Sequence, residues 1–177
     1  KAGNEEGTME AIGSVFRPAA LFATNKENFV LDNGDIATQL NSSNMLWCLA
    51  GNLAITNRIL FGINFEPDGL AFKPFVPKAL AGERTLDNFT YRNAVLSITV
   101  KGYGDEIKSF TLNGKEHAPF IPGNIKGDNR IVITMADNEI APMKVNRSAN
   151  VKAPLTPVAW IEGDEFRWNP LEYSEKY

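Results

Sequence analysis

Hydrophobic positions recur at helical spacing in the first part of the chain. Met9, Ile12 and Phe16 follow one another at intervals of three and four residues, which predicts a helix that ends near residue 25. Asn4 precedes two glutamates and is a suitable N-cap, because its side chain can accept a hydrogen bond from the first turn. Pro18 lies inside this segment and is expected to kink the helix.

A second helical segment, residues 45–61, is hydrophobic around nearly its whole circumference. Ser42, Ser43 or Asn44 can supply its N-cap, and Gly62 can end it. A helix without a polar face is typical of the interior of a large protein. Two helices and a small set of strands do not provide such an interior. We therefore expect protein that the chain lacks, or another subunit, to cover this segment.

Beyond residue 63 the hydrophobic period changes to two, which predicts strands. Residues 96–101 and 131–135 alternate apolar and polar positions, and shorter candidates are 70–74, 86–91 and 108–112. Turn sequences rich in Gly, Asn, Asp and Pro separate them at 67–69, 102–105, 113–114 and 127–129. Short strands at this spacing predict an antiparallel β-sandwich.

We therefore predict an α+β fold in three parts. Residues 1–62 form a terminal helical hairpin, residues 63–140 form the β-sandwich, and residues 141–177 form a linker and the start of a further β segment. In the last part, strand-like residues 166–168 followed by Asn-Pro and spaced tyrosines resemble the opening of a fibronectin type III module. The alternative is an extended tail that packs its aromatic side chains on the sandwich.

Composition and charge exclude several classes of function. The net charge of -3 gives no electrostatic reason to bind nucleic acid. Asn52 and Asn57 interrupt the longest apolar stretch, so no membrane span is expected. The single cysteine, Cys48, is expected to be a small buried hydrophobic residue, and the single histidine, His117, lies in a polar loop. No ligand spacing predicts a metal site, and no cofactor is expected.

Five ordered segments within residues 1–140 resemble bacterial six-hairpin glycoside hydrolases, most nearly the trehalase and processing α-glucosidase group. Residues 3–7 (GNEEG), 20–29 (ALFATNKENF) and 42–51 (SSNMLWCLAG) are similar to the last hairpin of the catalytic barrel, and residues 60–70 (LFGINFEPDGL) and 75–77 (FVP) to the start of the C-terminal sandwich. The resemblance implies that this chain is the C-terminal part of an enzyme whose catalytic domain is an α/α toroid.

The same resemblance implies a catalytic base. In the α-glucosidase relatives the base lies in a loop reading approximately Glu-x-Tyr-Asn-x-x-Thr-Gly, upstream of a helix that carries a tryptophan. Glu27 and Asn28 occupy the similar place ahead of Trp47, although Phe29 replaces the tyrosine and the Asn-x-x-Thr-Gly run is absent. Inverting hydrolysis also needs a general acid, with the two carboxyl groups about 6.5–9.5 Å apart. The resemblance places that acid in an earlier hairpin, so the isolated chain is expected to be inactive.

The candidate substrate-binding residues are Glu5, Glu6, Asn28 and Trp47. Glu5 and Glu6 are candidates to hydrogen-bond a sugar, and the alternative is that they serve as charges at a helix N-terminus. Trp47 is a candidate to stack on a sugar ring or, alternatively, to lie in a hydrophobic core. Glu27 is the candidate catalytic base, and its alternative is a solvated loop acid.

The predicted function is general acid/base hydrolysis of glycosidic bonds in an oligo- or polysaccharide by the parent protein. The resemblance implies a bacterial, periplasmic or extracellular location, with the upstream barrel or a second copy of the chain covering residues 45–61. A phosphorylase is a weaker alternative, because the sequence shows no phosphate site.

A further alternative is a carbohydrate-binding or purely structural β-sandwich without catalysis. An aromatic strip exposed on one sheet face favours binding. Inward-pointing aromatic side chains favour a structural role, and the candidates to examine are Phe72, Phe89, Tyr91 and Phe110.

Overall fold

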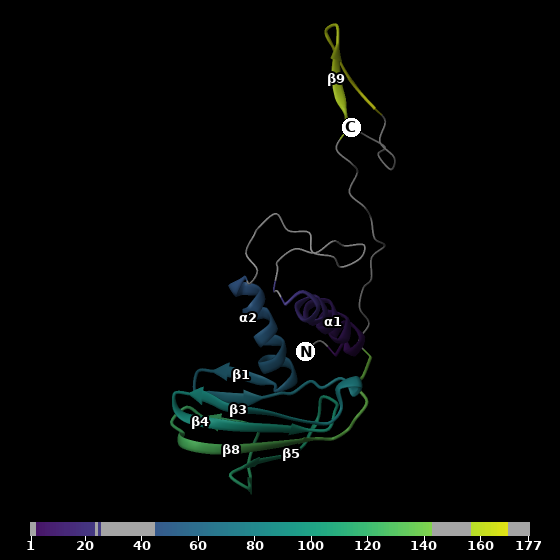
Figure 1. Cartoon of the computed structure of the whole chain (residues 1–177). Coiled ribbons are helices and arrows are strands. Elements are labelled where there is room, and N and C mark those ends of the chain that lie inside the picture. The colour runs from purple at the N-terminus through teal and green to yellow at the C-terminus, as the bar shows by residue number, and fades with distance from the viewer. Residues whose placement is uncertain (1–2, 24, 26–44, 143–156, 170–177) are drawn as a thin grey trace. The chain divides into compact units, whose positions relative to one another are not determined.

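The computed structural model describes residues 3–23, 25, 45–142 and 157–169. By its internal contacts the chain divides into two compact units, Lys1–Met143 and Lys144–Tyr177. The first unit contains helices α1 (Glu5–Phe22) and α2 (Leu46–Ala54) and two β-sheets, and the second contains a β-hairpin (Figure 1). The predicted α+β class is therefore confirmed, while the predicted division at residues 62 and 140 stays a prediction.

Helix α1 starts where the sequence predicts. The Asn4 side chain accepts a hydrogen bond from the Gly7 backbone N–H at 2.9 Å, and the Thr8 hydroxyl donates to the Asn4 carbonyl at 2.7 Å. Pro18 is buried inside the helix, which continues to Phe22. Asn4 is therefore confirmed as the N-cap, and it satisfies a donor that the helix itself leaves unpaired.

Helix α2 starts one residue later than the predicted caps allow. Its N-cap is Met45, which makes no side-chain capping bond, so the prediction of Ser42, Ser43 or Asn44 in this role is wrong. The reason is a backbone contact, because the Met45 N–H donates to the Asn25 carbonyl at 3.0 Å. Residues 42–44 themselves lie outside the described part of the chain.

The helix continues as a π-helical segment, η1 (Ile55–Leu60), with Phe61 as its C-cap, and the predicted closing residue Gly62 follows directly. Gly62 has φ +69, a backbone conformation that glycine adopts without steric cost. A Cβ atom at this position would lie 2.0 Å from the backbone nitrogen of Pro74. Glycine therefore lets the two backbones lie this close at the point where the chain passes from the helix into the first strand.

The strands of the first unit form one sheet of three strands and one of five. The smaller sheet has the order β1-β2-β7 and contains β1 (Ile63–Glu66), β2 (Gly69–Phe72) and β7 (Phe120–Pro122). The larger sheet has the order β3-β4-β8-β5-β6 and contains β3 (Glu83–Tyr91), β4 (Asn93–Lys101), β5 (Ile107–Leu112), β6 (Lys115–Glu116) and β8 (Lys126–Met135). A short 3-10 helix, η2 (Lys78–Leu80), precedes β3.

One strand pair departs from the predicted antiparallel pattern. Strands β4 and β8 run parallel, with Asn93 opposite Lys126 and Lys101 opposite Thr134. A parallel pair needs a long connection, and residues 102–125, which include β5, β6 and β7, supply it. The turn predicted at residues 127–129 is wrong for the same reason, since these residues lie inside β8 and pair with β4.

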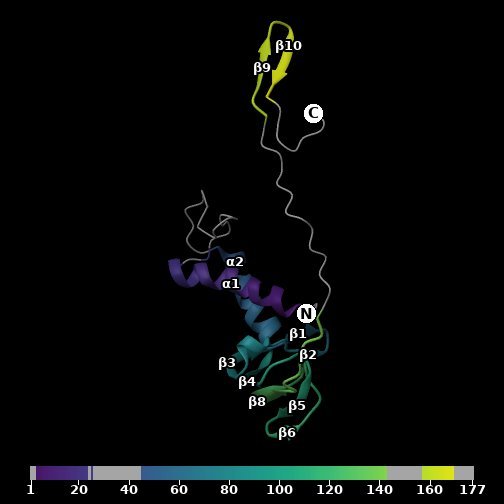
Figure 2. The same ribbon diagram turned by 90° about the vertical axis from the view of Figure 1, so that its right-hand side faces the viewer.

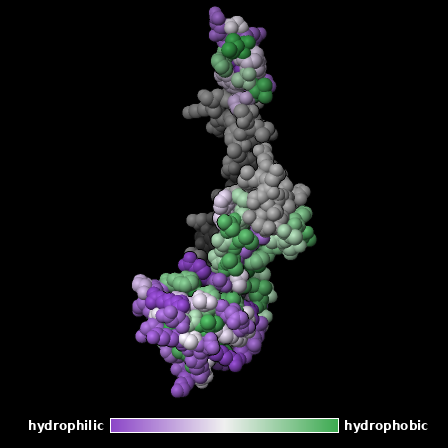
Figure 3. Space-filling view, turned by 60° about the vertical axis from the view of Figure 1, so that its left-hand side comes forward, coloured by the Kyte–Doolittle hydropathy of each residue, from purple (hydrophilic) through white to green (hydrophobic). Residues whose placement is uncertain are grey.

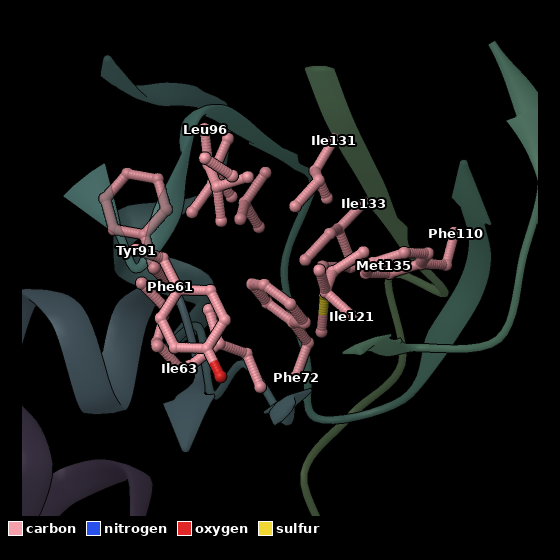
Figure 4. Close-up of a cluster of buried hydrophobic side chains, with 14 of the residues drawn as sticks. Phe61, Ile63, Phe72, Tyr91, Leu96, Phe110, Ile121, Ile131, Ile133 and Met135 are labelled. Atoms are coloured by element: carbon pink, nitrogen blue, oxygen red, sulfur yellow. The ribbon is translucent and has the colours of Figure 1, made fainter. Parts of the chain in front are cut away.

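The two sheets share one hydrophobic core. Phe72 and Ile121 come from the smaller sheet, and Leu96, Ile133 and Phe110 come from the larger one (Figure 4). The rings of Phe72 and Phe110 lie 5.3 Å apart between centroids. Full burial of each such side chain stabilises the fold by roughly 1.5–3 kcal/mol. Figures 1 and 2 show α1 and α2 on the side of β1, with β5 and β8 on the far side.

The second unit contains strands β9 (Ala159–Glu162) and β10 (Glu165–Trp168), which pair antiparallel. The side chain of Arg167 forms ion pairs with Glu165 at 2.7 Å and Glu162 at 3.6 Å. Residues 157–169 are exposed, which is the condition of a lone hairpin, and such a hairpin is marginally stable in water. Strand β10 includes residues 166–168, so the strand expected there is present.

Gly62→Ala is expected to lower the free energy of unfolding by on the order of 2 kcal/mol or more, because a Cβ atom would collide with backbone in a left-handed conformation. Gly51→Ala is the matched control, since nothing lies within 4 Å of the point that a Cβ atom would occupy there on α2. This second change should stabilise the helix by roughly 0.5–1 kcal/mol. Urea denaturation of both variants measures the difference, and equal midpoints would contradict the assignment.

Candidate functional site

The predicted site residues that the structure describes lie on the helices. Glu5 and Glu6 are in the first turn of α1, and Trp47 is near the start of α2. Glu27 and Asn28 lie outside the described residues, so their roles stay predictions. The arrangement of the predicted base around the predicted sugar-binding residues therefore lies outside the described part of the chain.

Glu5 makes a contact between the helical segment and the strands. Its carboxylate accepts a hydrogen bond from the backbone N–H of Lys78, the first residue of η2. The same carboxylate lies in the first turn of α1, where it interacts favourably with the helix dipole. This contact favours the structural interpretation of Glu5 over direct contact with a sugar. Glu6, the next residue, is exposed.

Trp47 lies on the surface of the first unit. Its neighbours Leu46 and Leu53 on α2 are also exposed, so this part of the helix presents a continuous apolar surface. Trp47 is therefore not part of the core that the two sheets share. An exposed indole can stack on a planar or apolar ligand face, or pack against another protein surface.

A small hollow separates α1 from η1. It has a volume of about 240 Å³, and its lining includes the N-cap Asn4 and Thr8 of α1 and Ile55 and Ile59 of η1. The polar groups of Asn4 and Thr8 are already bonded within the helix N-terminus. Among the lining residues there is no carboxylate, so the hollow offers no acid or base for hydrolysis.

Cys48 and His117 do not form a catalytic pair. Cys48 lies on α2 and is partly exposed rather than buried as predicted, because α2 rests on few neighbours. His117 follows β6 and is exposed, as expected for a polar loop, and its Nδ1 lies 2.9 Å from the Ala118 carbonyl oxygen. Among the described residues, no three His, Cys, Asp or Glu side chains are grouped to hold a metal ion.

The four aromatic side chains that were candidates for a sugar-binding strip belong to or pack against the core, whereas Phe65 on β1 is 63% exposed. Phe72, Tyr91 and Phe110 are buried in the shared core (Figure 4). Phe89 packs against this core while partly exposed. These positions therefore provide no aromatic strip for stacking on a sugar.

Within the described ranges, no helix combines the length and apolar character that crossing a membrane requires.

Sequence reasoning missed a polar hollow on the outer face of the five-stranded sheet. Its volume is about 480 Å³, and its lining includes Asp87, Ser97, Asn113 and Arg130. The alternating pattern places Ser97 away from the core, but it does not reveal which residues of other strands lie beside it. The signal that was available is the concentration of Asn, Asp and Ser near the ends of the predicted strands.

No model of a known protein family matches this chain, and no curated protein sequence matches it. The resemblance to six-hairpin glycoside hydrolases therefore rests on the residues of the segments that carry it. What it implies about function is a proposal.

Glu5→Ala is expected to accelerate hydrogen exchange at the Lys78 amide by about tenfold, because the amide loses a charged acceptor worth on the order of 1.4 kcal/mol. Amide exchange followed by NMR measures the rate residue by residue. Glu10→Ala, which removes an exposed carboxylate from the same helix, is the control and should leave that rate unchanged. Unaltered exchange in Glu5→Ala would show that the contact is not maintained in solution.

Proposed function

We propose that this chain is the C-terminal part of a bacterial glycoside hydrolase that cleaves glycosidic bonds in an oligo- or polysaccharide outside the cytoplasm. Residues 1–62 would be the last hairpin of an α/α toroid, and residues 63–140 its C-terminal β-sandwich. Residues 141–177 would be a linker and the start of a further β module. The family resemblance supplies the sugar chemistry, and the exposed surface of the helices supports the missing barrel.

The observation that carries the proposal is the apolar surface of α1 and α2. Leu46 is 79% exposed, Trp47 60% and Leu53 63%, and Leu21 on α1 is 68% exposed. Figure 3 shows hydrophobic residues gathered over the helical part, in contrast to the largely hydrophilic surface of the two sheets. Soluble proteins rarely leave large contiguous apolar patches in water. The helices therefore have the surface of elements that pack inside a larger helical assembly.

The proposed chemistry assigns one half of an acid/base pair to this chain. Glu27 would take a proton from a water molecule as that water attacks the anomeric carbon. An upstream Asp or Glu would protonate the leaving oxygen as the glycosidic C–O bond breaks. The two carboxyl groups would lie about 6.5–9.5 Å apart to leave room for the water. The chain alone would be inactive, because the acid and most of the substrate pocket belong to the barrel.

The two β-sheets of the first unit fit a supporting role in this proposal. Backbone bonds join it to the end of the helical segment, from Phe75 N–H to the Ile59 carbonyl at 2.9 Å and from Lys73 N–H to the Gly62 carbonyl at 2.8 Å. Phe72, Tyr91 and Phe110 are buried in its core, which favours a structural role over sugar stacking. The sheets would thus brace the last hairpin of the barrel.

The exposed surface of α2 predicts that the isolated chain self-associates. Replacing Leu46, Trp47 and Leu53 together by serine should shift the chain toward monomer, because about 1.5–3 kcal/mol of burial per side chain is lost from any interface. Sedimentation velocity over a range of concentrations measures the shift. A triple serine replacement of exposed Lys108, Lys115 and Lys126 is the control. A wild-type chain that is monomeric at all concentrations would count against a covered helix surface.

Glu27→Gln in the parent protein is expected to reduce hydrolysis by roughly a hundredfold or more, because the amide cannot act as a general base. Initial rates on a panel of oligosaccharides measure the loss, and circular dichroism checks that the fold is kept. Glu10→Gln is the matched control and should retain wild-type rates. Full turnover in Glu27→Gln would remove Glu27 from the mechanism, and a parent without glycosidase activity would overturn the proposed function.

A further inference from the structure

The polar hollow on the five-stranded sheet is built by strands that are far apart in the sequence. In the parallel pair, Ser97 of β4 lies opposite Arg130 of β8. On one side the Ser97 hydroxyl donates to the Asp87 carboxylate of β3 at 2.6 Å, and on the other the Asn113 N–H donates to the Arg130 carbonyl at 2.8 Å. These four residues form a row across neighbouring segments that spans about 14 Å at ordinary strand spacing.

The amide side chains of the hollow are held in fixed orientations. The Asn129 Nδ2 donates to the carbonyls of Lys126 and Gly127, both at 3.0 Å, so its Oδ1 accepts from Asn113 Nδ2 at 2.9 Å. The Asn113 Oδ1 in turn accepts from the Arg130 N–H at 2.8 Å. Because these hydrogen bonds already hold both amide side chains in place, a ligand would lose less binding free energy to the ordering of side chains.

A β-bulge shapes the opposite wall of the hollow. The register of β3 against β4 shifts between Leu86 and Phe89, and Asn88 has φ +56. Bulges turn side chains away from the regular pleat and are frequent beside binding sites. The bulge brings Asp87 beside Ser97, where the 2.6 Å hydrogen bond fixes the carboxylate.

Two charged side chains of the lining have no hydrogen-bond partner within the described residues. Asp128 and Arg130 line the hollow, and in the described part of the chain neither side chain forms a hydrogen bond or an ion pair. The carboxylate can accept hydrogen bonds, and the guanidinium can donate several in a planar fork. The hollow thus presents free acceptors and free donors beside each other on one surface.

We propose that this hollow binds a neutral polyhydroxylated ligand, a sugar, at a site separate from Glu27. Each sugar hydroxyl both donates and accepts, so a pair of neighbouring hydroxyls matches the carboxylate of Asp128 and the guanidinium of Arg130. Val95 lies in the same lining and offers an apolar contact for the C–H face of a ring. The proposal goes beyond the hydrolase function and does not depend on it.

The charges of the site select against other ligands. Asp87 and Asp128 together outweigh the positive charge of Arg130, which disfavours phosphate and other anions. Two carboxylates without a third acidic or histidine ligand are a poor site for a metal ion. The hollow is open and has no aromatic lining, so a dissociation constant on the order of 1 mM is expected.

The test is an NMR titration of the full chain labelled with nitrogen-15. Glucose-, mannose- and xylose-based di- and trisaccharides are added to tens of millimolar, with inorganic phosphate and calcium as separate arms. At least one sugar should give saturable amide shifts confined to residues 87–88, 95–97, 113 and 128–130. Asp128→Ala and Arg130→Ala should each weaken that binding about tenfold, since each removes a charged hydrogen-bonding group.

Lys101→Ala, at the other end of β4, is the matched control and should bind as the wild type. Unchanged amide spectra away from the hollow show that the variants are folded. The proposal is overturned if no sugar gives saturable local shifts, if phosphate or calcium binds there instead, or if the double variant at Asp128 and Arg130 binds as the wild type. Loss of activity in the parent Glu27→Gln protein would leave this result unaffected, so the two proposals fail independently.

Discussion

The parallel pairing of β4 and β8 is the constraint on which the first unit depends. These strands lie at the centre of the five-stranded sheet and contribute side chains such as Leu96 and Ile133, which no water reaches, to the shared core. Their inner faces pack against the smaller sheet, and their outer faces carry the polar hollow. Because one register fixes both faces, a slip by one residue would turn the core residues outward and dismantle the hollow at the same time.

Local patterns in the sequence predicted much of this unit. The Asn4 cap, the end of the helical segment at Gly62 and the strands around Leu96 and Ile133 follow from propensity and periodicity alone. The parallel pair did not follow, because the choice between parallel and antiparallel neighbours depends on contacts between distant segments. The same limitation produced the wrong turn at residues 127–129, where Gly, Asp and Asn occur inside a strand.

The candidate site was less predictable than the fold. Glu5 was suggested as a sugar contact or a helix-end charge, and its bond to the Lys78 amide became visible only in three dimensions. Trp47 has the spacing of a core residue, yet it is exposed. A periodic pattern identifies an apolar helix surface, but it does not show which other segment packs on that surface. The hollow around Arg130 combines residues from β3, β4, β8 and the turn after β5, so no local sequence motif could predict it.

The central position of β8 has a consequence for how the unit can be divided. β4 obtains its second neighbour, and β5 its link to the rest of the sheet, only through residues 126–135. Without that strand, both β4 and β5 would present unsatisfied backbone edges, and the hydrophobic layer beneath them would be open to solvent. The five-stranded sheet therefore cannot persist without β8. Recombination or proteolytic trimming that removes residues 126–135 would abolish the sheet rather than shorten it.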